Sequence, residues 1–579
     1  MTHTTAPDRT RAAPPLMRAV VLTLMALVVG FAAALAAIGF VEGVSWLNHA
    51  LLISPRARVQ LEGNPGLVTA ATVLVPTLGG LIVGVMLSRF SPEGRALGPP
   101  DVVRAVQLRA PLPSTRGGAV SSLAALVSLG FGASVGQYGP MVYLGAMIGG
   151  WVERLRLGVP NLPAIAVACG VAAAISTAFN APIAGLVFAH EVILRHYSMQ
   201  AFAPATVASA TGYVVANVMF ERPPLFLVDF GGVAHGYEFL LFALLGLASA
   251  GVALIFMRLV LASAVQAARL PLPPALRPAL AGLAVGVTAL ALPDVLGIGS
   301  EALRFATIEG AFRPGELVVL VAAKIVLTAL CVGFGFAGGV FSPALLIGIL
   351  FGALSWSLLD TAGIADTSGV AVYAVCAMMA VTSPVIGAPL TTILIVFELT
   401  RNYDLTIAAM VAVVFSNLIA YRVFGRSIFD VQLARRGVDL SAGRDRARLE
   451  AMTVAEWMST DFPSATAEMP ADEAQRTGAA SPYAEVFVTD AEGQLVGVLR
   501  AGRPGAGSAA DAAESAPVTF HADTTIWQAM QELGSFIGDA VPVVSRDNGR
   551  LEGVISEAAL IRAYLAAMQD LRGEENAPV

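Results

Sequence analysis

The glycine-rich stretch Phe131-Gly-Ala-Ser-Val-Gly-Gln-Tyr-Gly-Pro140 occurs a second time as Phe334-Gly-Phe-Ala-Gly-Gly-Val-Phe-Ser-Pro343. When the two are aligned, the leading Phe-Gly pair, a later glycine and the closing proline coincide. Each stretch lies between apolar segments and ends in a proline followed by a long apolar run, a pattern typical of a loop that leads into a helix. The chain therefore contains one structural unit used twice, with a break at the same place in each copy.

A second repeated pair supports this alignment. Ala181-Pro182 is followed by Glu191 at the same spacing at which Ala388-Pro389 is followed by Glu398. Inside a membrane, irregular backbone is tolerated only where it is buried in protein or lines a cavity, so corresponding breaks mark a binding site. Helix N-termini present free N–H groups and a positive dipole end, which favour an anion.

The composition places the chain in a membrane. Its residues are 56% hydrophobic and 13% charged, with a mean hydropathy of +0.73. Several apolar runs reach or approach the roughly 20 residues that a helix needs to cross a bilayer. They are 17–52, 67–87, 164–192, 239–261 and 316–331. The predicted fold class is an all-α polytopic membrane protein with a small α+β tail.

Charge and cysteine content exclude other classes. The net charge of −6 excludes a basic nucleic-acid surface. Cys169, Cys331 and Cys376 lie in apolar runs without metal-ligand spacing, so neither a metal nor another cofactor is predicted. Arginines before the first apolar run and at its start, namely Arg9, Arg11 and Arg18, favour a cytoplasmic N-terminus.

Four regions are expected along the chain. Residues 1–16 are a polar, disordered tail; 17–437 are the membrane domain, with halves of about 17–235 and 236–437; 438–452 are a linker; and 453–579 are a soluble region. In the soluble region, 486–498 and 541–554 each read as strand, tight turn and strand. Helical stretches precede them, and the Gly/Ala/Ser-rich segment 501–516 separates them as a linker.

These motifs resemble the CLC family of chloride channels and chloride/proton antiporters, over 17–437. Gly338-Gly-Val-Phe-Ser-Pro343 is similar to the family's G-x-F-x-P motif and Gly136-Gln-Tyr-Gly-Pro140 to its G-[KR]-E-G-P motif. Ala96-Leu-Gly-Pro-Pro-Asp101 resembles a degraded G-S-G-I-P-E motif, and the tail resembles a pair of CBS domains.

The resemblance implies two inverted halves with broken re-entrant helices, one pore in each subunit, and a homodimer in a lipid bilayer. It implies transport of chloride rather than enzyme activity. It also implies an integral protein of a bacterial inner membrane, with the N-terminus and the CBS tail in the cytoplasm.

Carried over by position, Val340 and Phe341 would offer N–H groups to a central anion, and Tyr138 would lie at an outer one. The full set of anion-binding positions that the resemblance implies is Val340, Phe341, Gly339, Gln137, Tyr138, Gly139, Leu97, Gly98 and Phe429.

The sequence departs from the family at the residues that decide the mechanism. The gating glutamate falls at Tyr138, the central serine at Leu97 and the central tyrosine at Phe429. The inner glutamate that passes protons aligns with Val192, while the acidic residue before it is kept as Glu191. A neutral phenol cannot replace a carboxylate that occupies the anion's place when charged and leaves when protonated.

We therefore expect chloride movement that is not obligatorily exchanged for protons. The alternatives are an antiporter whose proton is rerouted through Glu191 or His190, a different anion selected by the less polar Leu97 and Phe429, and a structural helix-end role for Glu191. An intramembrane metalloprotease built on His190, Glu191 and His196 lacks the required i, i+4 histidine spacing.

In the tail, CBS pairs hold the ribose of adenine nucleotides with a Ser/Thr and an Asp three residues later. This chain keeps Ser556 but has Ala559 at the Asp position. A nucleotide site at Ser556 is therefore incomplete, and a dimer-stabilising role is the alternative.

Overall fold

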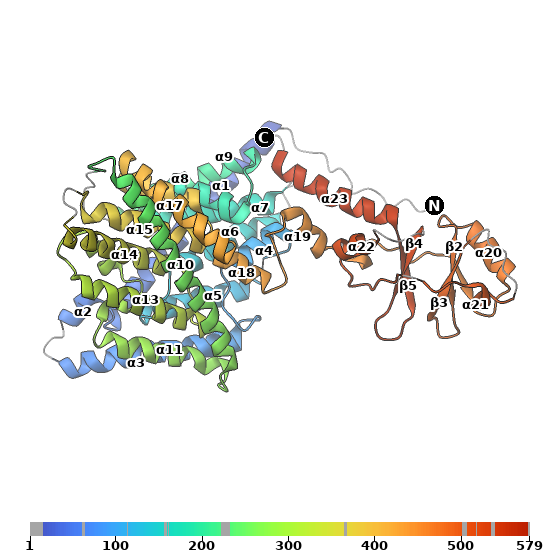
Figure 1. Cartoon of the computed structure of the whole chain (residues 1–579), viewed down its shortest axis with the longest axis horizontal. Helices are drawn as coiled ribbons and strands as arrows, with labels where there is room; N and C mark the ends of the chain where they lie inside the picture. The colour runs from blue at the N-terminus through green and yellow to red at the C-terminus, as the bar shows by residue number, and fades with distance from the viewer. Residues whose placement is uncertain are drawn as a thin grey trace. The chain divides into compact units, whose positions relative to one another are not determined.

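The computed structural model describes residues 15–60, 64–112, 114–155, 159, 161–221, 232–363, 367–500, 507–516, 518–533 and 539–576. The chain divides into two compact units at Gly437/Val438. They are a helical unit and a smaller unit that contains all the described strands (Figure 1). Residues 1–14 of the expected disordered tail lie outside the described residues, whereas Pro15 and Leu16 already belong to the first helix.

The first half of the helical unit runs from α1 to η3. Its elements are α1 (Pro15–Ala50), α2 (Pro55–Val59), α3 (Pro65–Phe90), α4 (Pro99–Leu108), α5 (Thr115–Gly130), α6 (Tyr138–Gly150), η1 (Trp151–Leu155), α7 (Leu162–Phe179), α8 (Pro182–Phe188), η2 (Ala189–Leu194), α9 (Met199–Val214) and η3 (Val215–Met219). The 36 residues of α1 extend over ~54 Å, far more than the ~30 Å bilayer core.

The second half runs from α10 to α18. Its elements are α10 (Glu238–Arg269), η4 (Pro274–Leu276), α11 (Arg277–Ala289), η5 (Pro293–Val295), α12 (Ser300–Phe305), α13 (Pro314–Gly333), α14 (Phe341–Thr361), α15 (Val370–Ile386), α16 (Pro389–Thr400), α17 (Tyr403–Phe424) and α18 (Ile428–Ala434). In the described part of the chain, seven helices are long and apolar enough to span a membrane. The predicted polytopic helical fold is confirmed.

The two halves repeat one packing scheme. Helix α7 packs on α6, α9 and α1, and its counterpart α15 packs on α14, α17 and α10. The halves meet through like elements, namely α3 with α11, α6 with α14 and α8 with α16. Such pairing of equivalent helices is what a duplicated module related by two-fold symmetry produces.

One of the apolar runs expected to span the membrane does not form a single helix. The apolar stretch 164–192 is broken after α7, where Asn180 adopts a left-handed conformation with φ 59° and Pro182 begins α8. An αL residue ends a helix and a proline starts the next one, although hydropathy continues unchanged through both. The chain then tightens into the π-helical η2, which carries His190 and Glu191.

The smaller unit confirms the predicted hairpins. Strands β2 (Glu485–Thr489) and β3 (Leu495–Arg500) pair antiparallel, as do β4 (Ala540–Val544) and β5 (Leu551–Ser556). The remaining elements are α19 (Arg444–Ala451), η6 (Val454–Glu456), β1 (Ser464–Thr466), α20 (Ala471–Ala479), α21 (Ala509–Ala512), α22 (Ile526–Glu532) and α23 (Glu557–Asn576). Strand β1 lies parallel to β2.

Both expected linkers contain structure. Segment 438–452 includes α19, whose Leu449 is buried in the same core as Ile526 and Leu560. Segment 501–516 includes α21, capped by the Ser508 hydroxyl, although 501–506 lie outside the described residues. Short amphipathic or Ala-rich turns of this kind become stable only through tertiary packing, which composition does not reveal.

Two carboxylates hold α8 and α16 together reciprocally. Glu191, after α8, accepts hydrogen bonds from the Leu390 and Thr391 amides at the start of α16, both at 2.9 Å. Glu398, near the end of α16, accepts from the Ile183 and Ala184 amides of α8 at 2.8 and 2.7 Å. Each negative charge thus stabilises the positive end of the other helix.

This geometry predicts equal structural roles for the two glutamates. Glu191→Gln and Glu398→Gln should each reduce stability by about 1–2 kcal/mol, because an amide oxygen accepts more weakly than a carboxylate. Glu153→Gln, at an exposed position, is the control and should change little. Thermal unfolding in detergent measures the effect; loss of stability in only one of the two variants would contradict reciprocal capping.

Candidate functional site

The two glycine-rich breaks bond directly to each other. The Gly136 N–H donates to the Gly339 carbonyl oxygen at 2.7 Å, and the Gly339 N–H donates back to the Gly136 oxygen at 2.8 Å. The bridge is antiparallel, as a two-fold relation between equal segments requires. It fixes the N-terminus of α6 beside that of α14.

Glycine is needed here because the backbones approach closely. A Cβ on Gly136 would lie 2.8 Å from the Gly339 oxygen and 3.0 Å from the Ser342 nitrogen. A Cβ on Gly338 would lie 2.4 Å from the Val135 side chain. Any larger residue would separate the two helix starts.

The first amides of α14 remain available. In the described part of the chain, the N–H groups of Val340 and Phe341 have no acceptor. Across the bridge, the Gln137 N–H is used by the Ser342 hydroxyl at 3.1 Å. The amide of Gly339 is committed to the bridge, so at the start of α14 Val340 and Phe341 are the residues whose N–H groups can be offered to an anion.

A buried lysine supports the first break by hydrogen bonds. Lys324 of α13, 1% exposed, donates to the carbonyl oxygens of Val295 and Gly297 at 3.0 and 2.7 Å. The Gly297 amide in turn donates to the Gly132 oxygen at 2.9 Å. Lys324 therefore ties α13 to the loop that precedes α6 through hydrogen bonds.

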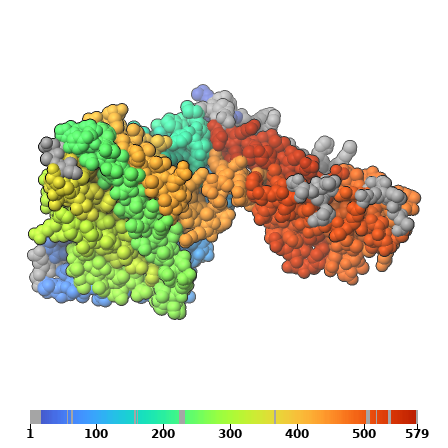
Figure 2. Space-filling model, viewed as in Figure 1, coloured from blue at the N-terminus to red at the C-terminus, as the bar shows by residue number. Residues whose placement is uncertain are grey.

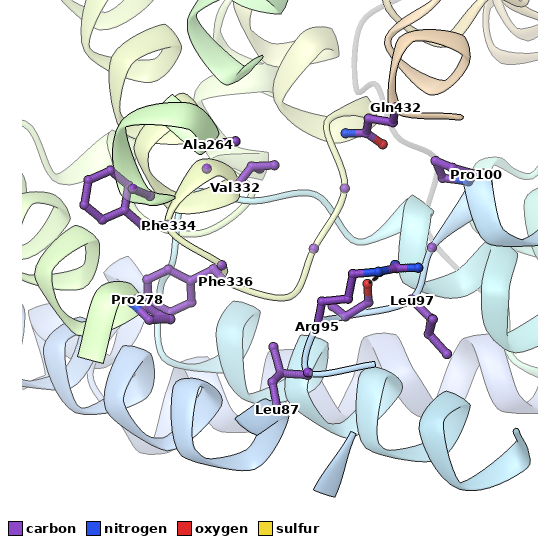
Figure 3. Close-up of a pocket in the computed structure, with 18 of the residues that line it drawn as sticks. Leu87, Arg95, Leu97, Pro100, Ala264, Pro278, Val332, Phe334, Phe336 and Gln432 are labelled. Atoms are coloured by element: carbon purple, nitrogen blue, oxygen red, sulfur yellow. Dashed lines mark hydrogen bonds between the residues drawn. The ribbon is translucent and has the colours of Figure 1, made fainter. Parts of the chain in front are cut away.

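A cavity of about 320 Å³ opens at the start of α14. Its walls include Leu97 and Gly98 before α4, Gly339 and Val340 before α14, and Phe429 of α18. Figure 3 shows Leu97 and Arg95 across the cavity from Phe334 and Phe336. The structure thus brings together three of the predicted segments, which are far apart in sequence.

Charge in this cavity is centred on Asp101. Its carboxylate, 5% exposed, accepts from Arg95 at 2.6 Å and from Arg436 at 2.9 Å. It also accepts from the Gly98 amide at 3.0 Å, which caps α4. With Arg277, three arginines and one carboxylate line the cavity, so its local charge is positive.

Leu97 and Phe429 present no hydroxyl to the cavity. The Leu97 amide is committed to the Ser121 hydroxyl at 3.0 Å. Phe429 is held in place by α18, whose Ser427 and Asp430 cap the helix start. Asp430 is further bound by Arg195. Both positions are buried and apolar where the resemblance implies polar side chains.

Tyr138 does not line this cavity and lies in an aromatic cluster. Its ring centroid is 4.1 Å from that of Phe179 and 5.2 Å from that of Phe341, and Phe188 stacks on Phe341 at 6.3 Å. Tyr138 is 5% exposed. Tyr138 therefore packs as a plug at the position implied for the gate, while Gly139 lies against Gly339.

The predicted proton-path residues point in different directions. The Glu191 carboxylate also accepts from the Thr391 hydroxyl at 2.7 Å, so it faces α16. His190 is fully buried, with Nδ1 3.0 Å from the Leu186 oxygen and its ring stacked on Tyr197.

In the tail, the Ser556 hydroxyl accepts from the Ala559 amide at 3.2 Å and caps α23.

Sequence reasoning missed the arginines of the cavity. Arg95 directly precedes the motif at 96–101, and Arg436 follows Phe429 by seven residues. Their positions beside these predicted site residues could have indicated that they line the cavity. Phe179 and Phe188 were also missed, since single aromatics in apolar runs carry no pattern.

Fold and site together define a class: an integral membrane protein with duplicated halves whose broken helices meet at a positively charged cavity. The family model described as "Voltage gated chloride channel" matches residues 79–421, and the "CBS domain" model matches 509–566. The chain belongs to the voltage-gated chloride channel (CLC) family and carries a C-terminal CBS domain. Members of this family are channels and transporters, and CLC-type anion transport is the activity that this membership supports.

Curated relatives are similar over most of their length. A ClcB-like chloride channel protein of Ralstonia nicotianae is 32% identical, over 71% of this chain and 96% of that protein. The H(+)/Cl(−) exchange transporter ClcA of Yersinia pseudotuberculosis is 28% identical, over 72% of this chain and 87% of that protein.

Solved structures agree on the fold. A slow cyanobacterial Cl−/H+ antiporter matches with a TM-score of 0.64 and 25% identity, over 72% of this chain and 97% of that one. A eukaryotic CLC transporter matches with a TM-score of 0.63 and 19% identity, over 94% of this chain and 98% of that one. The latter shows the fold alone.

The bridge predicts a sharp difference between two glycines. Gly136→Ala should lower stability by about 1–3 kcal/mol and reduce anion flux, because its Cβ meets backbone that cannot yield. Gly251→Ala is the matched control, since a Cβ there meets nothing within 4 Å. Thermal unfolding and vesicle flux measure both; a Gly136→Ala protein as stable and active as Gly251→Ala would contradict the role of the bridge.

Proposed function

We propose that this chain conducts chloride passively through the cavity at the α14 N-terminus, with Tyr138 in place of the gate. The observation that carries the proposal is the Tyr138 ring packed against Phe179 and Phe341 beside the helix starts. A phenol with an ordinary pKa near about 10 stays neutral at physiological pH, so it cannot compete with chloride as a carboxylate does.

The cavity chemistry supports an anion as the transported species. Moving an ion from water into a low-dielectric medium costs of order 20 kcal/mol in the idealised limit, so oriented donors must replace its hydration shell. The free amides of Val340 and Phe341 and the excess of arginine around Asp101 supply such donors and a positive potential.

Proton-coupled exchange is the second candidate, because relatives named as H(+)/Cl(−) exchangers align over most of this chain. At the position of the family's inner, proton-passing glutamate this chain has Val192, which is buried and cannot carry a proton. Both carboxylate oxygens of Glu191 accept from α16, in three hydrogen bonds, and a proton on either oxygen would compete with the bonds made there. These contacts favour a helix-capping role for Glu191.

We further propose a homodimer in a bacterial inner membrane, with the N-terminus and the CBS tail in the cytoplasm. Arg18 at the start of α1 and the arginines at the end of α17 support this orientation.

Because the Ser556 hydroxyl caps α23 and Ala559 is buried, a structural role of the tail is favoured over adenine-nucleotide binding.

Flux measurements test coupling directly. Protein reconstituted in vesicles with a chloride gradient should release chloride without moving protons, and external pH should stay constant. Tyr138→Glu should make flux acid-activated, because a charged carboxylate blocks the outer site and a protonated one leaves it. Tyr138→Phe is the control and should keep flux independent of pH. Stoichiometric proton uptake by the wild-type protein would overturn the proposal.

The apolar central positions predict an unusual selectivity. Without hydroxyl donors at Leu97 and Phe429, weakly hydrated anions such as nitrate should permeate more readily than chloride. Restoring the donors with Leu97→Ser and Phe429→Tyr should shift the permeability ratio toward chloride by about tenfold, since one hydrogen bond to a charged group contributes about 1.5–3 kcal/mol. Reversal potentials under ion substitution measure the ratio; an unchanged ratio would show that these positions do not contact the anion.

A further inference from the structure

A second groove, separate from the anion cavity, lies on the surface of the membrane unit. Its volume is about 410 Å³, and it is bounded by the last three turns of α10 and by the residue that follows α18. Three arginines contribute to it, Arg258 and Arg269 from α10 and Arg435 after α18, together with the apolar Leu261 and Val265. Figure 2 shows α10, in green, beside the orange of the C-terminal membrane helices.

The arginines of this groove are uncompensated. Among the described residues, the side chains of Arg258, Arg269 and Arg435 make no hydrogen bond or ion pair. The neighbouring Arg436 is different, because it pairs with Asp101 at 2.9 Å. Three exposed positive charges around one groove, with no acid among its lining residues, are available to an anion from outside the chain.

The length of α10 indicates that the groove lies at the depth of lipid headgroups. Arg258 follows Glu238, the first residue of α10, by about 20 residues, which is ~30 Å of helix and the thickness of the hydrocarbon core. The stretch from Arg258 to Arg269 therefore leaves the core. Ile255, just before this stretch, and Leu259, near its start, are 55% and 37% exposed and provide an apolar path toward the bilayer.

We propose that this groove binds the headgroup phosphate of an anionic glycerophospholipid, in the leaflet that holds the C-terminal end of α10. The guanidinium groups bind the phosphate oxygens, for which their planar forks are suited. Leu261 and Val265 contact the first carbons of the acyl chains. The apolar wall favours a lipid over a free phosphate, which would gain nothing from it.

Lipid retention tests the proposal on the full-length protein. The protein is equilibrated with an equimolar mixture of phosphatidylglycerol and phosphatidylcholine, purified in mild detergent and examined by native mass spectrometry. Wild type should retain phosphatidylglycerol selectively. The triple variant Arg258→Gln, Arg269→Gln, Arg435→Gln should bind it on the order of a hundredfold more weakly, since each arginine near an anionic surface contributes roughly a fivefold factor.

Two matched variants control for charge and shape. Arg89→Gln, Arg116→Gln, Arg422→Gln removes three exposed arginines that line neither cavity, and it should retain the lipid as wild type does. Replacing Arg258, Arg269 and Arg435 by lysine keeps the charge and should restore most of the binding. Equal loss in both Gln triples, or no preference for phosphatidylglycerol in wild type, would overturn the proposal.

A thermal-shift measurement separates the two sources of phosphate. Phosphatidylglycerol should raise the melting temperature of the wild type but not of the Arg258/Arg269/Arg435 triple Gln variant. Inorganic phosphate alone should raise neither. Stabilisation of the wild type by inorganic phosphate to the same extent as by the lipid would show that the groove takes a free anion, and the lipid assignment would be wrong.

Discussion

The reciprocal hydrogen bonds between Gly136 and Gly339 are the constraint on which the rest of the membrane unit depends. Two helices that begin inside a bilayer leave irregular backbone where water cannot reach, and each unpaired group there is costly. The two breaks solve this problem by pairing with each other. Because the two breaks have equivalent sequences, they exchange equivalent hydrogen bonds, and the pairing places the α6 and α14 N-termini side by side.

Side chains also satisfy unpaired backbone groups across the two halves. Glu191 and Glu398 satisfy the orphan amides of α16 and α8, and neither helix start would be stable alone. A carboxylate used in this way accepts with both oxygens, so a proton on one oxygen would compete with the N–H group bound there. Glu191 is the acidic residue next to the position of the family's proton-passing glutamate. Its protonation would therefore weaken the contact between the two halves.

Much of this fold could be predicted from local patterns. The duplicated breaks, the start of α14 and both tail hairpins follow from glycine, proline and alternating apolar residues. The break at Asn180 could not, because hydropathy is continuous through it and only backbone conformation changes. The Asp101 cluster was equally hidden, since Arg436 lies at the far end of the membrane unit in sequence and reaches Asp101 only through the packing of α18 on α4.

The cluster of Asp101 and its arginines also affects how a site without hydroxyl donors can hold an anion. Leu97 and Phe429 leave the backbone amides of Val340 and Phe341 as the near donors, and a single helix terminus contributes only about 0.3–2 kcal/mol. Asp101 neutralises one of the three cavity arginines, so the remaining two set the sign of the potential. Inside a cavity with low-dielectric walls such a potential is focused rather than screened. Attraction by arginine at a distance then substitutes for contact with hydroxyl groups, and it selects by charge more than by the identity of the ion.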